Sequence, residues 1–95
     1  SSVSCTGSAV EGLTRALALE LAPKRVNAVA PGIADTAMFD RFGDKKEEAL
    51  ANMGKNILLG RVGKATEVAD AIVFIMTNAY ITGITIDVDG GVLLP

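Results

Sequence analysis

The side chains that could take part in nucleophilic or metal chemistry are few in this chain. It contains one cysteine, Cys5, one tyrosine, Tyr80, and no histidine. A cysteine nucleophile needs a neighbouring base, so without histidine Cys5 is interpreted as an incidental thiol. The same shortage leaves no credible ligand set for zinc or an iron–sulfur cluster. The sequence therefore predicts no metal site and no cysteine-based catalysis.

Two carboxylates near the end of the chain could in principle attract a cation. Asp87 and Asp89 are two residues apart, but a cation such as Ca²⁺ requires several more oxygen ligands. We therefore interpret them as marking a solvated turn, and Asp89-Gly90-Gly91 as a chain reversal. Asn27, the polar residue of an otherwise mostly apolar segment, is interpreted as a structural or solvent-facing side chain.

Two helices, each followed by a strand, would have to position any site. Apolar residues at three- and four-residue spacing predict a helix from Ser8 to about Leu21, and they are Val10, Leu13, Leu17 and Leu21. Pro23 ends this helix because it lacks a backbone donor. A short strand is expected at about 25 to 30, closed by the turn Pro31-Gly32.

The second half of the chain begins with a long, irregular stretch from Ile33 to Gly63. A short helix from Lys45 to Met53 is expected inside it, and a stretch of this length is usually functional or mobile. Thr66 is predicted to be the N-cap of a second long helix that runs to about Asn78. Its apolar side would comprise Val68, Ile72, Ile75 and Met76. The β-branched residues at 84–88 predict another strand.

This order of elements is that of a βαβ unit. The strands at 25–30 and 84–88 are therefore expected to be parallel, with a right-handed connection. A sheet of only two parallel strands leaves backbone groups unpaired along both edges. The sequence thus predicts an α/β fold in which residues 1–95 are one portion of a larger sheet.

Composition excludes several classes of partner. The net charge is −2 and the nine Lys and Arg residues are scattered, so there is no basic stripe for a nucleic acid. The apolar runs are far shorter than the roughly 20 residues that span a bilayer. Together with the single cysteine, these features predict a soluble, cytoplasmic protein without nucleic-acid or membrane partners.

Three segments, in order, resemble the short-chain dehydrogenase/reductase family, especially its 3-oxoacyl-carrier-protein reductase-like members. They are AVEGLTRALALELAPKRVNAVAPG at 9–32, IADTAM at 33–38 and LGRVGKATEVADAIVFIMTNAYITGITIDVDGG at 59–91. The resemblance implies the C-terminal part of a Rossmann-like, doubly wound parallel sheet. It also implies an NAD(P)-dependent oxidoreductase that acts on a hydroxyl or carbonyl group of a small molecule.

By this resemblance, the loop after the first strand lies beside the nicotinamide ring. Its cofactor-binding candidates are Pro31, Gly32, Ile33 and Thr36. The backbone of Ile33 would meet the carboxamide, and the Thr36 hydroxyl would bond to the carboxamide or the pyrophosphate; alternatively, Thr36 caps a short helix. Met38 and Phe39 would begin the substrate loop. With Phe42, they would form either a hydrophobic pocket or the underside of a lid.

The family's catalytic residues are missing from their expected places. The family uses a Tyr acid/base with a Lys four residues later, and alignment of the first helix places these positions on Val3 and Gly7. A second alignment, from the first four residues, assigns the catalytic serine to Ser2, and the two alignments require a deletion between them. Tyr80 does not match the motif. A glycine-rich phosphate loop and the residue that selects NAD or NADP are also absent.

Two hypotheses follow from the resemblance. In the first, the chain is a C-terminal fragment of an oxidoreductase, inactive alone and without a bound cofactor of its own. In the second, it is a non-catalytic oligomerisation module. The resemblance implies dimer or tetramer contacts through the helices at 8–21 and 67–78 and the strand at 84–88.

Overall fold

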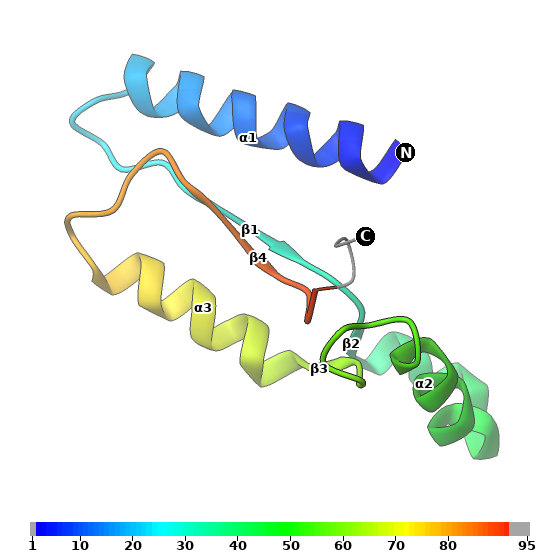
Figure 1. Ribbon diagram of the computed structural model, residues 1–95. Coiled ribbons are helices and arrows are strands. Elements are labelled where there is room, and N and C mark those ends of the chain that lie inside the picture. Colours follow the sequence, from blue (N-terminus) through cyan, green and yellow to red (C-terminus); the bar gives the residue numbers. More distant parts are fainter. Residues whose placement is uncertain (1, 92–95) are drawn as a thin grey trace.

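The computed structural model describes the backbone of residues 2–91 and the side chains of residues 7–91. In Figure 1, two paired strands run between helix α1 on one side and helix α3 on the other, and a smaller helical segment projects from one end. The elements are, in order, α1 (Ser2–Glu20), β1 (Ala28–Pro31), β2 (Ala34–Asp35), the 3₁₀ helix η1 (Ala37–Lys45), α2 (Lys46–Gly54), β3 (Gly63–Lys64), α3 (Ala65–Thr77) and β4 (Thr85–Val88). The predicted α/β fold with parallel strands is confirmed.

Strands β1 and β4 pair in parallel, from Ala28 opposite Thr85 to Pro31 opposite Val88. The first strand was expected at 25–30, but it begins at Ala28 and ends at Pro31. Before Ala28, the Val26 carbonyl still accepts the Gly83 N–H at 2.8 Å, and the Asn27 side chain adds two further bonds. Asn27 donates from Nδ2 to the Ile81 carbonyl at 3.0 Å and accepts the Ile84 N–H at 3.2 Å. These bonds confirm the structural interpretation of Asn27.

Helix α1 begins earlier than the sequence predicted. It starts at Ser2, so the expected start at Ser8 is wrong, and it ends at Glu20. Its first turns contain small and polar residues, which carry no hydrophobic period. The most buried described side chain of α1 is that of Thr14, whose hydroxyl donates to the Val10 carbonyl at 2.7 Å. Leu13 of the predicted apolar stripe is 60% exposed.

Helix α3 begins at Ala65, which makes the predicted N-cap Thr66 wrong. The carboxylate of Glu67 reaches back and accepts the Lys64 N–H at 2.8 Å. This bond satisfies a backbone donor that would otherwise lack a partner in the first turn. The helix start is therefore stabilised by the carboxylate of Glu67, and not by the hydroxyl of Thr66 as predicted.

The other end of α3 is tied to the chain segment before β1. Arg25 donates from Nη1 to the Ile75 carbonyl and from Nη2 to the Met76 carbonyl, each at 2.9 Å. These carbonyls have no partner within the helix at its C-terminus, where a cation is also favoured by the helix dipole. Arg25 thus fixes α3 relative to the segment that leads into β1.

Little of the apolar surface is buried within this chain. The buried hydrophobic residues of the described part are Ile57 and Ile75, at 5% and 7% exposure. The accessible surface is 6825 Å², against about 5,200 Å² for a compact monomer of this mass. Much of the predicted apolar surface of α1 and α3 is therefore exposed to solvent. None of the described helices is long and apolar enough to cross a membrane.

Candidate functional site

The loop at residues 31–36 lies at the carboxyl edge of the two main strands. Pro31 is the last residue of β1 and stands opposite Val88, the last residue of β4. The chain then passes through Gly32 and Ile33 into β2, which pairs in parallel with β3. In open α/β sheets, ligands bind outside the carboxyl ends of the strands. The structure therefore places the predicted cofactor loop at the edge where such sites form.

Gly32 is held where a larger residue would not fit. A Cβ atom built on Gly32 would lie 2.7 Å from the Cβ and 2.8 Å from the Cα of Asp89. Its N–H donates to the Val88 carbonyl at 2.9 Å, which keeps the two strand ends together. The structure reveals a close approach between two parts of the chain itself.

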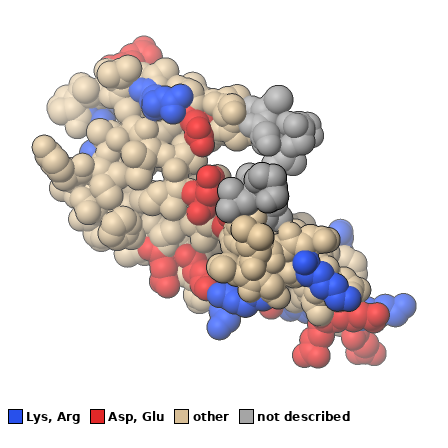
Figure 2. Space-filling model, in the orientation of Figure 1, with Lys and Arg blue, Asp and Glu red and all other residues tan. Residues whose placement is uncertain are grey.

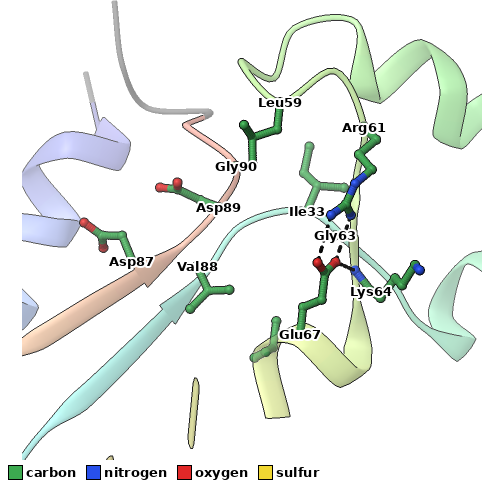
Figure 3. Close-up of a pocket in the computed structure, with 11 residues that line it drawn as sticks. Ile33, Leu59, Arg61, Gly63, Lys64, Glu67, Asp87, Val88, Asp89 and Gly90 are labelled. Carbon is green, nitrogen blue, oxygen red and sulfur yellow. Dashed lines mark hydrogen bonds and ion pairs between the residues drawn. The ribbon is translucent and has the colours of Figure 1, made fainter. Parts of the chain in front are cut away.

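Ile33 lines a pocket of about 240 Å³ between this loop and the start of α3. Its carbonyl accepts the N–H of Gly63, at 2.9 Å, and thereby joins the loop to β3. The close-up in Figure 3 shows the side chains that surround this space. The other lining residues are Leu59, Arg61, Gly63, Lys64, Glu67, Val68, Asp87, Val88, Asp89 and Gly90. Of the predicted cofactor residues, Ile33 is the one that lines this pocket.

An ion pair between Arg61 and Glu67 lies along one side of the pocket. Arg61 donates from Nη1 and Nη2 to the two carboxylate oxygens of Glu67, each at 2.8 Å (Figure 3). This pairing, with the Lys64 N–H, lowers the pKa of Glu67 to about 2. Glu67 is thus a fixed negative charge at neutral pH and not an acid–base group. Sequence reasoning missed the pair, although the capping-box spacing of Lys64 and Glu67 was a signal for part of it.

Asp87 lies in β4, and Asp89 begins the turn that follows it. Asp89 accepts the Gly91 N–H at 2.8 Å, as expected for a tight turn. Figure 3 shows its side chain directed away from the Arg61–Glu67 pair. Among the side chains that the structure describes, those of residues 7–91, no group of three or more His, Cys, Asp or Glu could hold a metal ion.

Thr36 is exposed and stands immediately before η1 in an extended conformation. Its hydroxyl makes no capping hydrogen bond to η1; its carbonyl instead accepts the Phe39 N–H at 3.0 Å. Thr36 therefore occupies the N-cap position of η1, as the alternative interpretation expected, but its hydroxyl makes no capping hydrogen bond.

The segment Ala37–Gly54, formed by η1 and α2, is called the lid below. Met38 is exposed near its start, while Phe39 and Phe42 are half-buried and stack with their ring centroids 6.0 Å apart. The guanidinium of Arg41 lies 5.2 Å from the Phe42 ring centroid. The two phenylalanines therefore pack on each other, whereas Met38 leaves apolar surface accessible.

Lys46 was not singled out by the sequence. Its Nζ atom lies 3.2 Å from Asp35 Oδ1 and 2.6 Å from Asp40 Oδ1. Hydrogen bonds to Asp40 and Asp35 raise the pKa of Lys46. The partners are eleven residues before it and six residues before it, spacings that no local sequence rule connects. The pair with Asp35 links the lid to β2, which lies within the predicted cofactor loop.

The positions aligned with the family's catalytic pair lie on one helix. Val3 and Gly7 are four residues apart in α1 and so fall on the same face. The side chain of Ser2 lies outside the described residues. Tyr80 is 99% exposed and precedes β4. Because β1 and β4 are parallel, Tyr80 lies toward the opposite end of the sheet from loop 31–36.

Comparisons with known proteins agree with this architecture. A family model described as Enoyl-(Acyl carrier protein) reductase matches residues 3–93. The chain belongs to the short-chain dehydrogenase/reductase family. It is 52% identical over 85 residues to human 3-oxoacyl-[acyl-carrier-protein] reductase, which covers 87% of this chain and 33% of that protein.

Two solved structures related to this short-chain dehydrogenase/reductase share its fold. One is a small-chain dehydrogenase in complex with NADPH, with a TM-score of 0.78, 40% identity, and coverage of 93% of this chain and 41% of that chain. The other is MalC reductase/Diels-Alderase from Malbranchea aurantiaca, with a TM-score of 0.80, 38% identity, and coverage of 93% and 34%. The chain spans about a third of the length of the curated relatives it matches.

Proposed function

We propose that residues 1–95 form the C-terminal part of a single Rossmann-like domain in an NAD(P)-dependent oxidoreductase. The substrate would carry a hydroxyl or carbonyl group, and the chain alone would be inactive. The observation that carries the proposal is the cofactor-side loop at the carboxyl edge of the β1–β4 pair, in a chain of this family. A solved relative is described as a complex with NADPH.

In this proposal, loop 31–36 receives the nicotinamide end of the cofactor, which supplies hydride transfer when bound. The Ile33 carbonyl already accepts a bond from Gly63, so its N–H is the group that we assign to the carboxamide. The exposed Thr36 hydroxyl would bond to the carboxamide or the pyrophosphate. Pro31 and Gly32 support the loop: Gly32 bonds to Val88 and allows the close approach of Asp89.

The substrate side would be formed by the start of the lid. Met38 is exposed there, and Phe39 stacks on Phe42 to give a firm apolar surface. An apolar portion of a substrate could bury area against these residues. The proposal leaves open whether the cofactor is NAD or NADP. The cytoplasmic location expected from the single cysteine stays a prediction.

Inactivity of the chain alone follows from its residues. A valine and a glycine occupy the positions aligned with the family's Tyr and Lys, and neither can transfer a proton or lower a neighbouring pKa. Ser2 is the remaining candidate, by resemblance alone. A protein that supplies the missing acid/base pair and the glycine-rich loop to these elements would be expected to turn over.

The test is the change in absorbance at 340 nm with NADH or NADPH. The substrates are ketones and 3-oxoacyl thioesters, with alcohols and the oxidised cofactor in the reverse direction. We expect no change with the 95-residue chain, and a change with a protein that joins it to a family N-terminal half carrying the Tyr-x-x-x-Lys pair. Turnover by the chain alone contradicts its inactivity, while a folded but inactive joined protein contradicts the oxidoreductase assignment.

A second candidate function is a non-catalytic oligomerisation module. The observation that favours it is the apolar surface of α3, where Val73, Phe74 and Met76 are 57%, 54% and 67% exposed. Figure 2 shows uncharged surface over much of the α1 and α3 side, with charged residues gathered on the lid. Contiguous exposed apolar surface commonly marks a protein interface. Helices 8–21 and 67–78 and strand 84–88 would supply the contacts.

Sedimentation equilibrium tests this alternative. The module hypothesis predicts a dimer or tetramer at low micromolar concentration, and predicts that Phe74→Glu shifts it to monomer. Lys55→Glu, at an exposed position after α2, is a control that should leave the assembly intact. A well-folded monomer of the unaltered chain contradicts the hypothesis.

A further inference from the structure

The backbone of the lid departs from helical geometry at one glycine, which lies within η1. Gly43 has φ 56° and ψ −126°, a conformation that interrupts η1 before α2 begins. Glycine adopts such positive-φ conformations at no steric cost, unlike other residues. At the far end, Gly54 closes α2 against the next segment, where an added Cβ would lie 2.9 Å from Arg61 Cα. The lid backbone is thus closely packed at Gly54 and departs from helical geometry at Gly43.

Lys46 connects the parts of the lid on either side of Gly43. It is the first residue of α2, and its ammonium group contacts Asp40 in η1 at 2.6 Å and Asp35 in β2 at 3.2 Å. The Asp40 pair holds the two halves of the lid together. The Asp35 pair holds the lid to the strand that continues the cofactor-side loop, because β2 follows Ile33 directly. One side chain thus connects three elements.

The position of Lys46 is not explained by the stability of its own helix. A cation in the first turn of a helix is opposed by the helix dipole, which favours negative charge there. Glu47 and Glu48 of the same turn satisfy that preference, whereas Lys46 does not. The ion pairs with Asp35 and Asp40, which both lie outside α2, offset this unfavourable interaction with the helix dipole. Its side chain is 30% exposed, less than the 44% of Asp35 and the 63% of Asp40.

We propose that Lys46 is a positioning residue that fixes both halves of the lid against β2, which lies within loop 31–36. When the two ion pairs break, the lid is expected to turn about Gly43 and to move away from that loop, with the β1–β4 pair unchanged. The relevance of this tether to a substrate rests on the proposed oxidoreductase function. The tether itself requires no cofactor and no substrate.

Hydrogen–deuterium exchange of the 95-residue chain tests the tether directly. Lys46→Met is expected to accelerate exchange of the lid amides by roughly two- to fivefold, the range for loss of exposed ion pairs. Lys46→Arg keeps the charge and should exchange close to the unaltered chain. Lys45→Met removes the neighbouring exposed lysine, which takes part in none of the ion pairs found among the described side chains (7–91), and lid exchange should stay unchanged.

Amides of β1 and β4 provide the internal reference, because a variant that unfolds globally loses protection there as well. Asp35→Asn, which leaves both lid helices intact, supplies a second route and should accelerate lid exchange while β1 and β4 keep their protection. The proposal is overturned if Asp35→Asn leaves lid exchange unchanged. It is also overturned if Lys45→Met acts like Lys46→Met, or if Lys46→Arg fails to restore protection. Because no ligand is present, these outcomes are independent of the 340 nm assay.

Discussion

Replacement of Gly32 by alanine is predicted to destabilise the chain, because Gly32 packs directly against the backbone of Asp89. The new Cβ would lie 2.7 and 2.8 Å from the Cβ and Cα of Asp89, well inside van der Waals contact. Neither neighbour is the mobile end of a side chain, so the strand ends must move apart. That movement strains the Gly32 N–H bond to Val88, which is 2.9 Å long.

The expected magnitude is the difference of two effects. Overpacking at a tightly packed position costs about 1–3 kcal/mol. Replacing a glycine also restricts the unfolded chain, which favours folding by about 0.4–1 kcal/mol. The difference of these two ranges gives a net loss for Gly32→Ala of about 0–2.6 kcal/mol, with a central value of about 1.3 kcal/mol. For a domain of this size, the central value corresponds to a fall in Tm of roughly 5–10 °C.

Gly12→Ala is the matched control. Gly12 lies in α1, and an added Cβ there would meet nothing within 4 Å. Alanine within a helix is about 0.5–1 kcal/mol more favourable than glycine, so this variant should melt at a higher temperature than the unaltered chain. Thermal unfolding followed by far-UV circular dichroism measures both variants. If Gly32→Ala is as stable as the unaltered chain, the close approach to Asp89 is not a constraint and the reasoning fails.

Two further predictions concern charged contacts. The Arg61–Glu67 pairing lowers the pKa of Glu67 to about 2 from 4.5, so its contribution is present above pH 4.5 and is lost as the pH falls from about 4.5 to about 2. Urea denaturation across this window should show a steeper loss of stability for the unaltered chain than for Glu67→Gln, and equal slopes would contradict the pairing. Arg25→Met removes the guanidinium bonds to the last α3 carbonyls and is expected to cost about 1–3 kcal/mol, with faster hydrogen exchange at Asn78. Unchanged exchange there would show that Arg25 does not hold the helix end.

The parallel α/β arrangement could be predicted because it depends on local signals in a fixed order. Two amphipathic helices and two short apolar strands, separated by turn residues, leave few alternatives for a right-handed crossover. The position of loop 31–36 at the carboxyl edge was implied by the resemblance to the short-chain dehydrogenase/reductase family. The strand bounds were less accurate because the residues before Ala28 are held partly by bonds from the Asn27 side chain to Ile81 and Ile84.

Features that depend on a choice between competing local partners, or on contacts distant in sequence, were not predicted. The sequence indicates that Thr66 can cap a helix, but the choice of Glu67 depends on its bonds to the Lys64 N–H and to Arg61. The bridge from Lys46 to Asp35 exists only because the lid folds back toward β2. The hydrophobic pattern of α1 indicated which side of the helix is apolar. It did not indicate whether another part of this chain covers that side, and Leu13 is in fact exposed.

The central claim is that loop 31–36 forms the nicotinamide end of an NAD(P) site. Its most direct test is amide chemical-shift mapping of residues 1–95, isotopically labelled within a protein that also carries the family's N-terminal half. NAD⁺ or NADP⁺, whichever binds, is compared with its adenine-containing half, which lacks nicotinamide. The Ile33 and Thr36 amides are expected to shift with the dinucleotide and not with the half molecule. Saturating dinucleotide that leaves both amides unmoved would contradict it.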